Sequence, residues 1–168
     1  MRLYFSKDKR GRDLLIAEDA KIIQRWSNFR GLGSRFNAEG NRNFDLIIPD
    51  EMAEEMRADG WNIKQTRGSD EYPAEYYTNV NISWAKFPPS VNFITSRGET
   101  AVDESVIGQL DTAEIERMDI AINLSYRKKD DGSTGIKGYV QTMDVWLYED
   151  PIMAARSART ANRLPFEE

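Results

Sequence analysis

The feature that most constrains the fold is a long two-stranded pattern in the last third of the chain. Over residues 117–127, apolar and polar side chains alternate without a break, which is typical of a half-buried antiparallel strand. Asp131 and Gly132 follow in a polar stretch and form a common hairpin turn signal. A longer strand is expected over residues 136–148, and its alternation slips near Thr142, which predicts a β-bulge or a sharp bend. The pattern therefore favours a small, curved antiparallel sheet.

The rest of the chain contains shorter elements of mainly β character. Strands are expected over residues 1–5, 20–26, 43–48, 61–64, 76–84 and 91–95. A helix of roughly ten residues is expected between Asp50, as its N-cap, and Gly60 at its C-terminal end. We therefore predict a mostly β (α+β) fold: an OB-fold-like small antiparallel barrel over residues 1–150 with one inserted helix, then a C-terminal helix and short tail over residues 151–168.

Composition excludes several kinds of chemistry. The 168 residues include neither cysteine nor histidine, which removes thiol nucleophiles, histidine-based acid–base catalysis and the usual zinc sites. We therefore predict no enzymatic activity and no cofactor. No window approaches the roughly 18 consecutive apolar residues of a membrane span, so a cytoplasmic location without membrane contact is expected. The net charge of −5 means that any nucleic acid must bind to a local basic patch.

Such a patch is present between Arg25 and Phe44. This stretch contains four arginines, four aromatic residues and three glycines, with a single acidic residue. Guanidinium groups neutralise phosphates, aromatic rings stack on bases, and glycines allow close approach of the backbone. The alternative is a strand, a loop and a second strand whose rings point into the core. For Trp26 and Phe44 both interpretations stay open, whereas Phe29 and Phe36 flank the glycines and favour exposure.

Several segments together resemble a known group of proteins. Residues 29–37 and 40–44, Ile48-Pro49-Asp50, residues 60–62 and residues 134–140 look like segments of small phage and prophage proteins. The order of parts is similar to that of phage single-stranded DNA-binding proteins of the OB-fold type. The resemblance implies a role in phage DNA replication or recombination in the bacterial host cytoplasm, with replication or recombination proteins as partners and a homodimer as one possible state. Such proteins tend to carry a strongly acidic C-terminal tail, which this chain lacks.

These observations lead to one main hypothesis for function, namely sequence-tolerant binding of single-stranded DNA. Phosphates are expected to contact the arginines of the loop and the lysines of the late hairpin, while aromatic rings stack on bases. The predicted nucleic-acid-binding residues are Arg25, Trp26, Phe29, Arg30, Arg35, Phe36, Arg42, Lys128, Lys129, Lys137 and Tyr139.

Two other functions are compatible with the same residues. Arginine and aromatic side chains also dominate protein–protein hot spots, so the chain could instead be a phage-encoded interaction module that inhibits a host enzyme. The carboxylates Asp103, Glu104 and Asp111 could hold a magnesium ion, but acids on a turn-rich segment are far more often simply solvated. We therefore predict no metal site.

Overall fold

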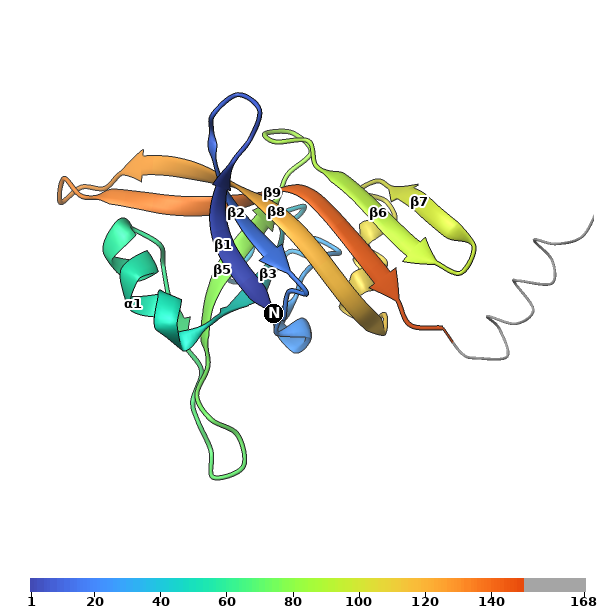
Figure 1. The fold of residues 1–168 in the computed structure, drawn as a ribbon, viewed down its shortest axis with the longest axis horizontal. Coiled ribbons are helices and arrows are strands. Elements are labelled where there is room, and N and C mark those ends of the chain that lie inside the picture. The colour runs from blue at the N-terminus through green and yellow to red at the C-terminus, as the bar shows by residue number, and fades with distance from the viewer. Residues whose placement is uncertain (150–168) are drawn as a thin grey trace, which may run out of the picture.

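The computed structural model describes residues 1–149 (Figure 1). Within that range the chain forms one α-helix, α1 (Asp50–Asp59), and two short 3₁₀ helices, η1 (Gln24–Trp26) and η2 (Ile107–Asp111). The strands are β1 (Arg2–Lys7), β2 (Asp13–Glu18), β3 (Arg42–Ile48), β4 (Lys64–Gln65), β5 (Tyr76–Ile82), β6 (Ser90–Thr95), β7 (Gly98–Val102), β8 (Ile115–Lys128) and β9 (Thr134–Leu147). The mostly β composition confirms the predicted fold class. The C-terminal helix expected over residues 151–168 lies outside the described residues.

Five of these strands follow one another along the sheet and form a small barrel. Hydrogen-bonded neighbours follow the order β2, β8, β9, β5 and β3. After β2 the chain continues along the free side of β3, where Ile22 forms a bridge with Leu46. The Ile23 amide donates to the Asp45 carbonyl at 3.0 Å, and the Ile47 amide donates to the Lys21 carbonyl at 2.9 Å. Residues 21–23 thus join the two ends of the sheet, as the predicted OB-type barrel requires.

The long strand β9 belongs both to the barrel and to a second part of the sheet, which is formed with β6 and β7. It pairs in parallel with β5 through Gly138 and Tyr139, and in parallel with β6 through residues 142–146. Figure 1 shows β8 and β9 crossing the whole molecule, with β6 and β7 at one end and α1 near the other. The predicted barrel was antiparallel throughout. These two pairings are parallel because the chain crosses from β5 and β6 to β9 through β7, η2 and β8.

The predicted irregularity in the last strand is a β-bulge. Ala121 pairs with Thr142 and the next residue, Ile122, pairs with Val140, so Gln141 is an extra residue on β9. An extra residue bends and twists its strand. The bend lies between the part of β9 that completes the barrel and the part that carries β6, which explains how one strand serves both.

The barrel encloses an apolar core, to which β2, β3, β5, β8 and β9 contribute alternate side chains. The fully or almost fully buried members include Leu15, Phe44, Leu46, Ile48, Val80, Ile120, Ile122 and Val140. Helix α1 adds Ala53 and Met56 to this core. No helix among residues 1–149 is long and apolar enough to cross a membrane.

The ends of α1 were predicted with partial success. The N-cap residue is Pro49, without a side-chain hydrogen bond, rather than Asp50, which is the first helical residue. Gly60 ends the helix as predicted, in the left-handed region at φ 119°. A Cβ at this position would lie against the Thr134 carbonyl oxygen, so both the backbone conformation and the close approach require glycine.

The first part of the chain differs most from the prediction. The strand expected over residues 1–5 is present from Arg2 onward as β1, which pairs with β2. The strand expected over residues 20–26 is shorter, because only residues 21–23 run along β3 before the chain turns into η1. Strand β2 was missed because the apolar residues 14–16 interrupt a period of two.

Candidate nucleic-acid interface

Two adjoining parts of the barrel form the candidate interface. The first is residues 24–41, here called the arginine–aromatic loop, which connect residues 21–23 to β3. The second, here called the outer face, consists of side chains of β3 and β5 that point away from the core. In OB-folds, the second and third barrel strands and the loop before the second strand are the usual contacts for oligonucleotides. The topology therefore places the predicted loop beside the expected binding face.

The outer face is defined by the register of β3 and β5. Successive cross-strand pairs on this side of the sheet are Asn43–Asn81, Asp45–Asn79 and Ile47–Tyr77. The Asn79 side chain donates to Asp45 Oδ1 at 2.9 Å and to Asn43 Oδ1 at 3.1 Å. The middle of the face thus presents amides and one carboxylate. A phosphate is repelled by this carboxylate, so the middle of the face suits base edges better than the DNA backbone.

An aromatic pair lies across one end of the outer face. Trp26, at the end of η1, contacts Tyr77 edge to face, with ring centroids 5.5 Å apart and an angle of 62° between planes. The Trp26 side chain is 44% exposed, and the Arg25 guanidinium lies 4.7 Å from its ring centroid. Exposed rings with an adjacent cation are the usual means of holding an unpaired base and its phosphate.

The tip of the loop carries a second exposed ring. Phe36 is 92% exposed, and the Arg35 guanidinium lies 5.6 Å from its centroid. The tip is ordered by its own hydrogen bonds, since the Asn37 amide group donates to the Leu32 carbonyl at 2.9 Å and to the Asn41 carbonyl at 2.9 Å. A large ring is therefore held in solvent by a loop that is fixed from within.

The root of the loop is anchored by Asp111. Its carboxylate accepts hydrogen bonds from the Ser27 hydroxyl at 2.9 Å, the Phe29 amide at 2.8 Å and the Arg30 amide at 3.1 Å. The Arg30 side chain adds an ion pair at 4.0 Å while staying half exposed. The sequence offered Asp111 as one of three carboxylates for a magnesium site, and no metal-binding cluster is found among residues 1–149. Its observed contacts instead assign it to the loop.

Asp103 and Glu104, the other two residues offered for a magnesium site, also have structural contacts. Hydrogen bonds from the Ser105 hydroxyl and amide lower the pKa of Asp103, whose carboxylate stabilises the turn that precedes η2. Glu104 contributes its backbone carbonyl, which accepts a hydrogen bond from Arg42 at 3.1 Å. The segment between β7 and β8 is therefore a support for the loop.

Phe29 is the clearest correction to the predicted site. Its ring is fully buried and stacks on Phe44 in the core, with centroids 5.4 Å apart and planes at 18°. The prediction that Phe29 stacks on bases is wrong for this structure, because no part of the ring reaches solvent. Phe44, for which both interpretations were open, is likewise a core residue.

Arg42 lies at the base of the loop with its guanidinium turned inward. Besides its bond to Glu104, it donates to the Gly40 carbonyl at 3.3 Å, and its Nε is buried without a hydrogen-bond partner. A Cβ on Gly31, which adopts a φ of 68°, would lie only 2.6 Å from this guanidinium. Arg42 therefore packs the loop against the barrel. Only the N–H groups that do not bond to Gly40 or Glu104 are left for a phosphate.

The predicted residues of the late hairpin lie apart from the loop. Lys128 and Lys129 are exposed at the turn between β8 and β9, which Figure 1 shows at one end of the molecule. Tyr139 is on β9 near the middle of the barrel but is only 6% exposed, because Phe87 packs on it with centroids 4.8 Å apart. Lys137 lies 5.6 Å from the Tyr139 ring. Stacking of a base directly on Tyr139 is thus contradicted by its burial.

Sequence reasoning missed Tyr77 of the outer face and its neighbour Lys64 on β4. Tyr77 forms the aromatic pair with Trp26, and Lys64 is its neighbour across β4 and β5. Tyr77 could have been found, since it precedes Asn79 and Asn81 at a spacing of two and so shares their face. Lys64 could not, because its position depends on the pairing of a two-residue strand.

Comparisons with known proteins identify a family for this chain. A family model described as "Putative phage ssDNA-binding domain" matches residues 5–161. A C-terminal truncation of the single-stranded DNA-binding protein from bacteriophage Enc34 is similar in structure, with a TM-score of 0.50 and 11% identity over 90% of this chain and 98% of that chain. Since the identity is so low, this likeness is one of fold.

Two further solved structures are more distant in shape. The Enc34 protein in complex with ssDNA has a TM-score of 0.49 and 11% identity, over 89% of this chain and 98% of that chain. The single-stranded DNA-binding protein gp2.5 of bacteriophage T7 has a TM-score of 0.36 and 9% identity, over 99% of this chain and 97% of that chain. No curated protein matches the sequence.

Proposed function

The chain belongs to the family of phage ssDNA-binding domains, and we propose that it holds unpaired DNA on the outer face and the arginine–aromatic loop. The observation that carries this proposal is the exposed Trp26–Tyr77 pair, capped by Arg25 and lying across the strands that an OB-fold uses for oligonucleotides. A second exposed ring with its own arginine lies at the loop tip, at Phe36 and Arg35.

Binding is sequence-tolerant because it relies on stacking and on phosphate contacts. Every base has a face that can stack on Trp26 or Phe36, and Arg25, Arg30 and Arg35 are exposed to phosphates. The amides and the carboxylate in the middle of the outer face can accept hydrogen bonds from different bases. Lys128, Lys129 and Lys137 lie apart from the loop and form a separate cationic contact for a longer strand.

The proposal includes a role in phage DNA replication or recombination in the host cytoplasm. Its support is the family, which is one of phage proteins, and the chemistry of the loop, which suits exposed single strands. Replication or recombination proteins are the corresponding partners, and a homodimer is the oligomeric state to test by light scattering.

Fluorescence anisotropy with a labelled oligo-dT tests the proposal. We expect binding that weakens as salt rises, because each neutralised phosphate adds about −0.7 to the slope of log K against log salt. Trp26→Ala is expected to weaken binding by about 1–3 kcal/mol, the usual contribution of one stacked base. Tyr148→Ala is the matched control, because Tyr148 is exposed beyond the end of β9. No binding at low salt, or equal binding by Trp26→Ala, contradicts the proposal.

A further inference from the structure

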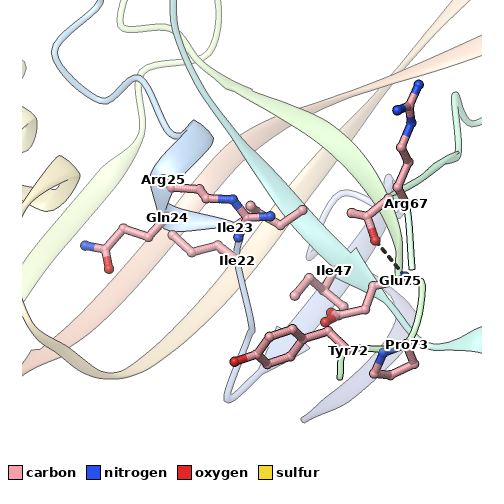
Figure 2. A pocket seen from close by; sticks show the side chains of 10 residues that line it. Ile22, Ile23, Gln24, Arg25, Ile47, Arg67, Tyr72, Pro73 and Glu75 are labelled. Atoms are coloured by element: carbon pink, nitrogen blue, oxygen red, sulfur yellow. Dashed lines mark hydrogen bonds between the residues drawn. The ribbon is translucent and has the colours of Figure 1, made fainter. Parts of the chain in front are cut away.

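A hollow lies beside the Trp26–Tyr77 pair. It has a volume of about 510 Å³ and is formed by residues 22–25, by β3 and by the loop of residues 66–75 that connects β4 to β5. The lining side chains relevant here are Ile22, Arg25, Ile47, Arg67, Tyr72 and Glu75 (Figure 2). None of these except Arg25 was predicted as a site residue.

The floor and one wall of the hollow suit a flat apolar ring. Ile22 and Ile47 are half-buried and expose part of their side chains to the hollow. Tyr72 is 71% exposed, although its loop is well fixed: the Ser69 amide donates to the Tyr72 carbonyl at 2.7 Å, and the Thr66 amide donates to the Glu75 carbonyl at 2.8 Å. An aromatic side chain is thus presented to solvent next to an apolar floor.

The charges around the hollow distinguish its two ends. Figure 2 shows Arg25 reaching in from the η1 side, with Tyr72 and Glu75 on the opposite side and the Arg67 side chain extending away from them. The Glu75 carboxylate repels a phosphate but accepts hydrogen bonds from N–H groups, which all four bases carry on their Watson–Crick edges. The base of a nucleotide therefore fits inside, with its phosphate at Arg25.

The hollow is continuous with the interface described above. Ile47 is paired in register with Tyr77, which contacts Trp26, and Arg25 borders both the ring pair and the hollow. A strand that stacks on Trp26 has only to place its next nucleotide in the hollow. This continuity identifies the occupant as a nucleotide of the same strand.

We propose that this hollow accepts one unpaired base, which stacks on Tyr72 above Ile22 and Ile47 while Arg25 holds its phosphate. The inference rests on the proposed function and adds a basis for selecting single strands. A base in a duplex has its Watson–Crick edge occupied and cannot leave its stack without losing that pairing. The hollow thus increases affinity only for DNA whose bases are already unpaired.

Affinity measurements on the variant Tyr72→Ala test this inference. By anisotropy with oligo-dT, we expect the dissociation constant to rise about 5- to 150-fold, as for the loss of one stacked base. Tyr148→Ala is the control of similar exposure and is expected to bind as the unchanged protein does. Because Tyr72 is on an exposed loop, thermal unfolding of Tyr72→Ala should match that of the unchanged protein.

Photochemical cross-linking supplies a readout of position. An oligo-dT with 5-iododeoxyuridine is expected to cross-link to Tyr72, and annealing it to its complement should abolish that product. If the unchanged protein binds oligo-dT and Trp26→Ala weakens it, but Tyr72→Ala binds normally and no cross-link falls in residues 66–75, this inference is wrong and the proposed function stands. If the unchanged protein does not bind oligo-dT, the proposed function itself fails.

Discussion

The root and the tip of the arginine–aromatic loop use the same residue types in opposite ways. Phe29 at the root is fully buried on Phe44, whereas Phe36 at the tip is 92% exposed. The arginines differ in parallel, since Arg42 is turned inward onto backbone carbonyls and Arg35 lies in solvent beside Phe36. One half of the loop is built like a core, and the other half like a contact surface.

The difference follows from what each half pairs with. At the root, Asn28 exchanges backbone hydrogen bonds with Asn43 on β3, at 2.8 and 3.2 Å, so the next residue on each segment faces the core. At the tip, the backbones of Ser34 and Asn37 bond to each other, at 2.8 and 3.3 Å, and not to a strand of the sheet, which leaves Phe36 without a sheet to pack against. Burial of a ring in this loop is thus decided by strand pairing rather than by its flanking residues.

The largest expected effect is on stability at the root. Phe29→Ala removes a buried ring and leaves a cavity, so we expect a loss of about 3–5 kcal/mol in the free energy of unfolding. Phe36→Ala should change that free energy by no more than about 0.5 kcal/mol, because the ring is exposed. Urea denaturation of both variants measures the contrast. Equal losses in the two variants would remove the distinction between root and tip.

The next largest effect is expected on stability when Asp111, which anchors the root of the loop, is changed. Asp111→Asn keeps the shape but removes the charge that accepts three hydrogen bonds, and we expect a loss of about 1–3 kcal/mol in the free energy of unfolding. It should also weaken oligo-dT binding, although removal of a negative charge alone would strengthen it. Glu55→Gln, on the exposed side of α1, controls for charge. Tighter DNA binding by Asp111→Asn would show that the anchor does not matter for the interface.

A third effect is on DNA binding at the tip. Phe36→Ala is expected to weaken oligo-dT binding by about 1–3 kcal/mol, since it removes one stacking surface. Phe5→Ala is a suitable control, because Phe5 is also an exposed phenylalanine but lies on β1. Anisotropy titrations at fixed salt compare the three proteins, and equal affinities for all of them would exclude Phe36 from the interface.

The smallest effect is on salt dependence. Arg35→Ala should make the slope of log K against log salt shallower by about 0.7, the value for one phosphate contact on a single strand. Arg10→Ala, at the turn between β1 and β2, is expected to leave the slope unchanged. Titrations at four or more salt concentrations give both slopes. An unchanged slope for Arg35→Ala would mean that the exposed guanidinium meets no phosphate.

Much of the fold could be predicted because its signals are local. The alternation of residues 117–127, the slip near Thr142 and the glycine after α1 each report on neighbouring residues, and the structure confirms all three. The predicted barrel also places the arginine–aromatic loop beside a face that binds oligonucleotides in OB-folds, and this binding stays a prediction. These features require no knowledge of which distant segments pair.

The remaining features depend on pairings between distant segments. Closure of the barrel by residues 21–23, the parallel partners of β9 and the burial of Phe29 all depend on registers that single-sequence patterns do not specify. Tyr139 was predicted to stack on bases, but Phe87 from a separate loop covers it. Tyr72 was not predicted as a site residue, since no local pattern places it beside Ile22 and Ile47.

The contact between residues 21–23 and β3, which joins the two ends of the sheet, affects how the barrel opens. The hydrogen bonds that join residues 21 and 23 to β3 are few in comparison with the long ladder between β8 and β9. The barrel should therefore open first between residues 21–23 and β3. The amides of Ile23 and Ile47 should then exchange with deuterium sooner than those of β8. Because Trp26 follows residues 21–23 directly, each opening would move this ring away from β3. A DNA strand bound across this contact would hold its two sides together and slow the exchange.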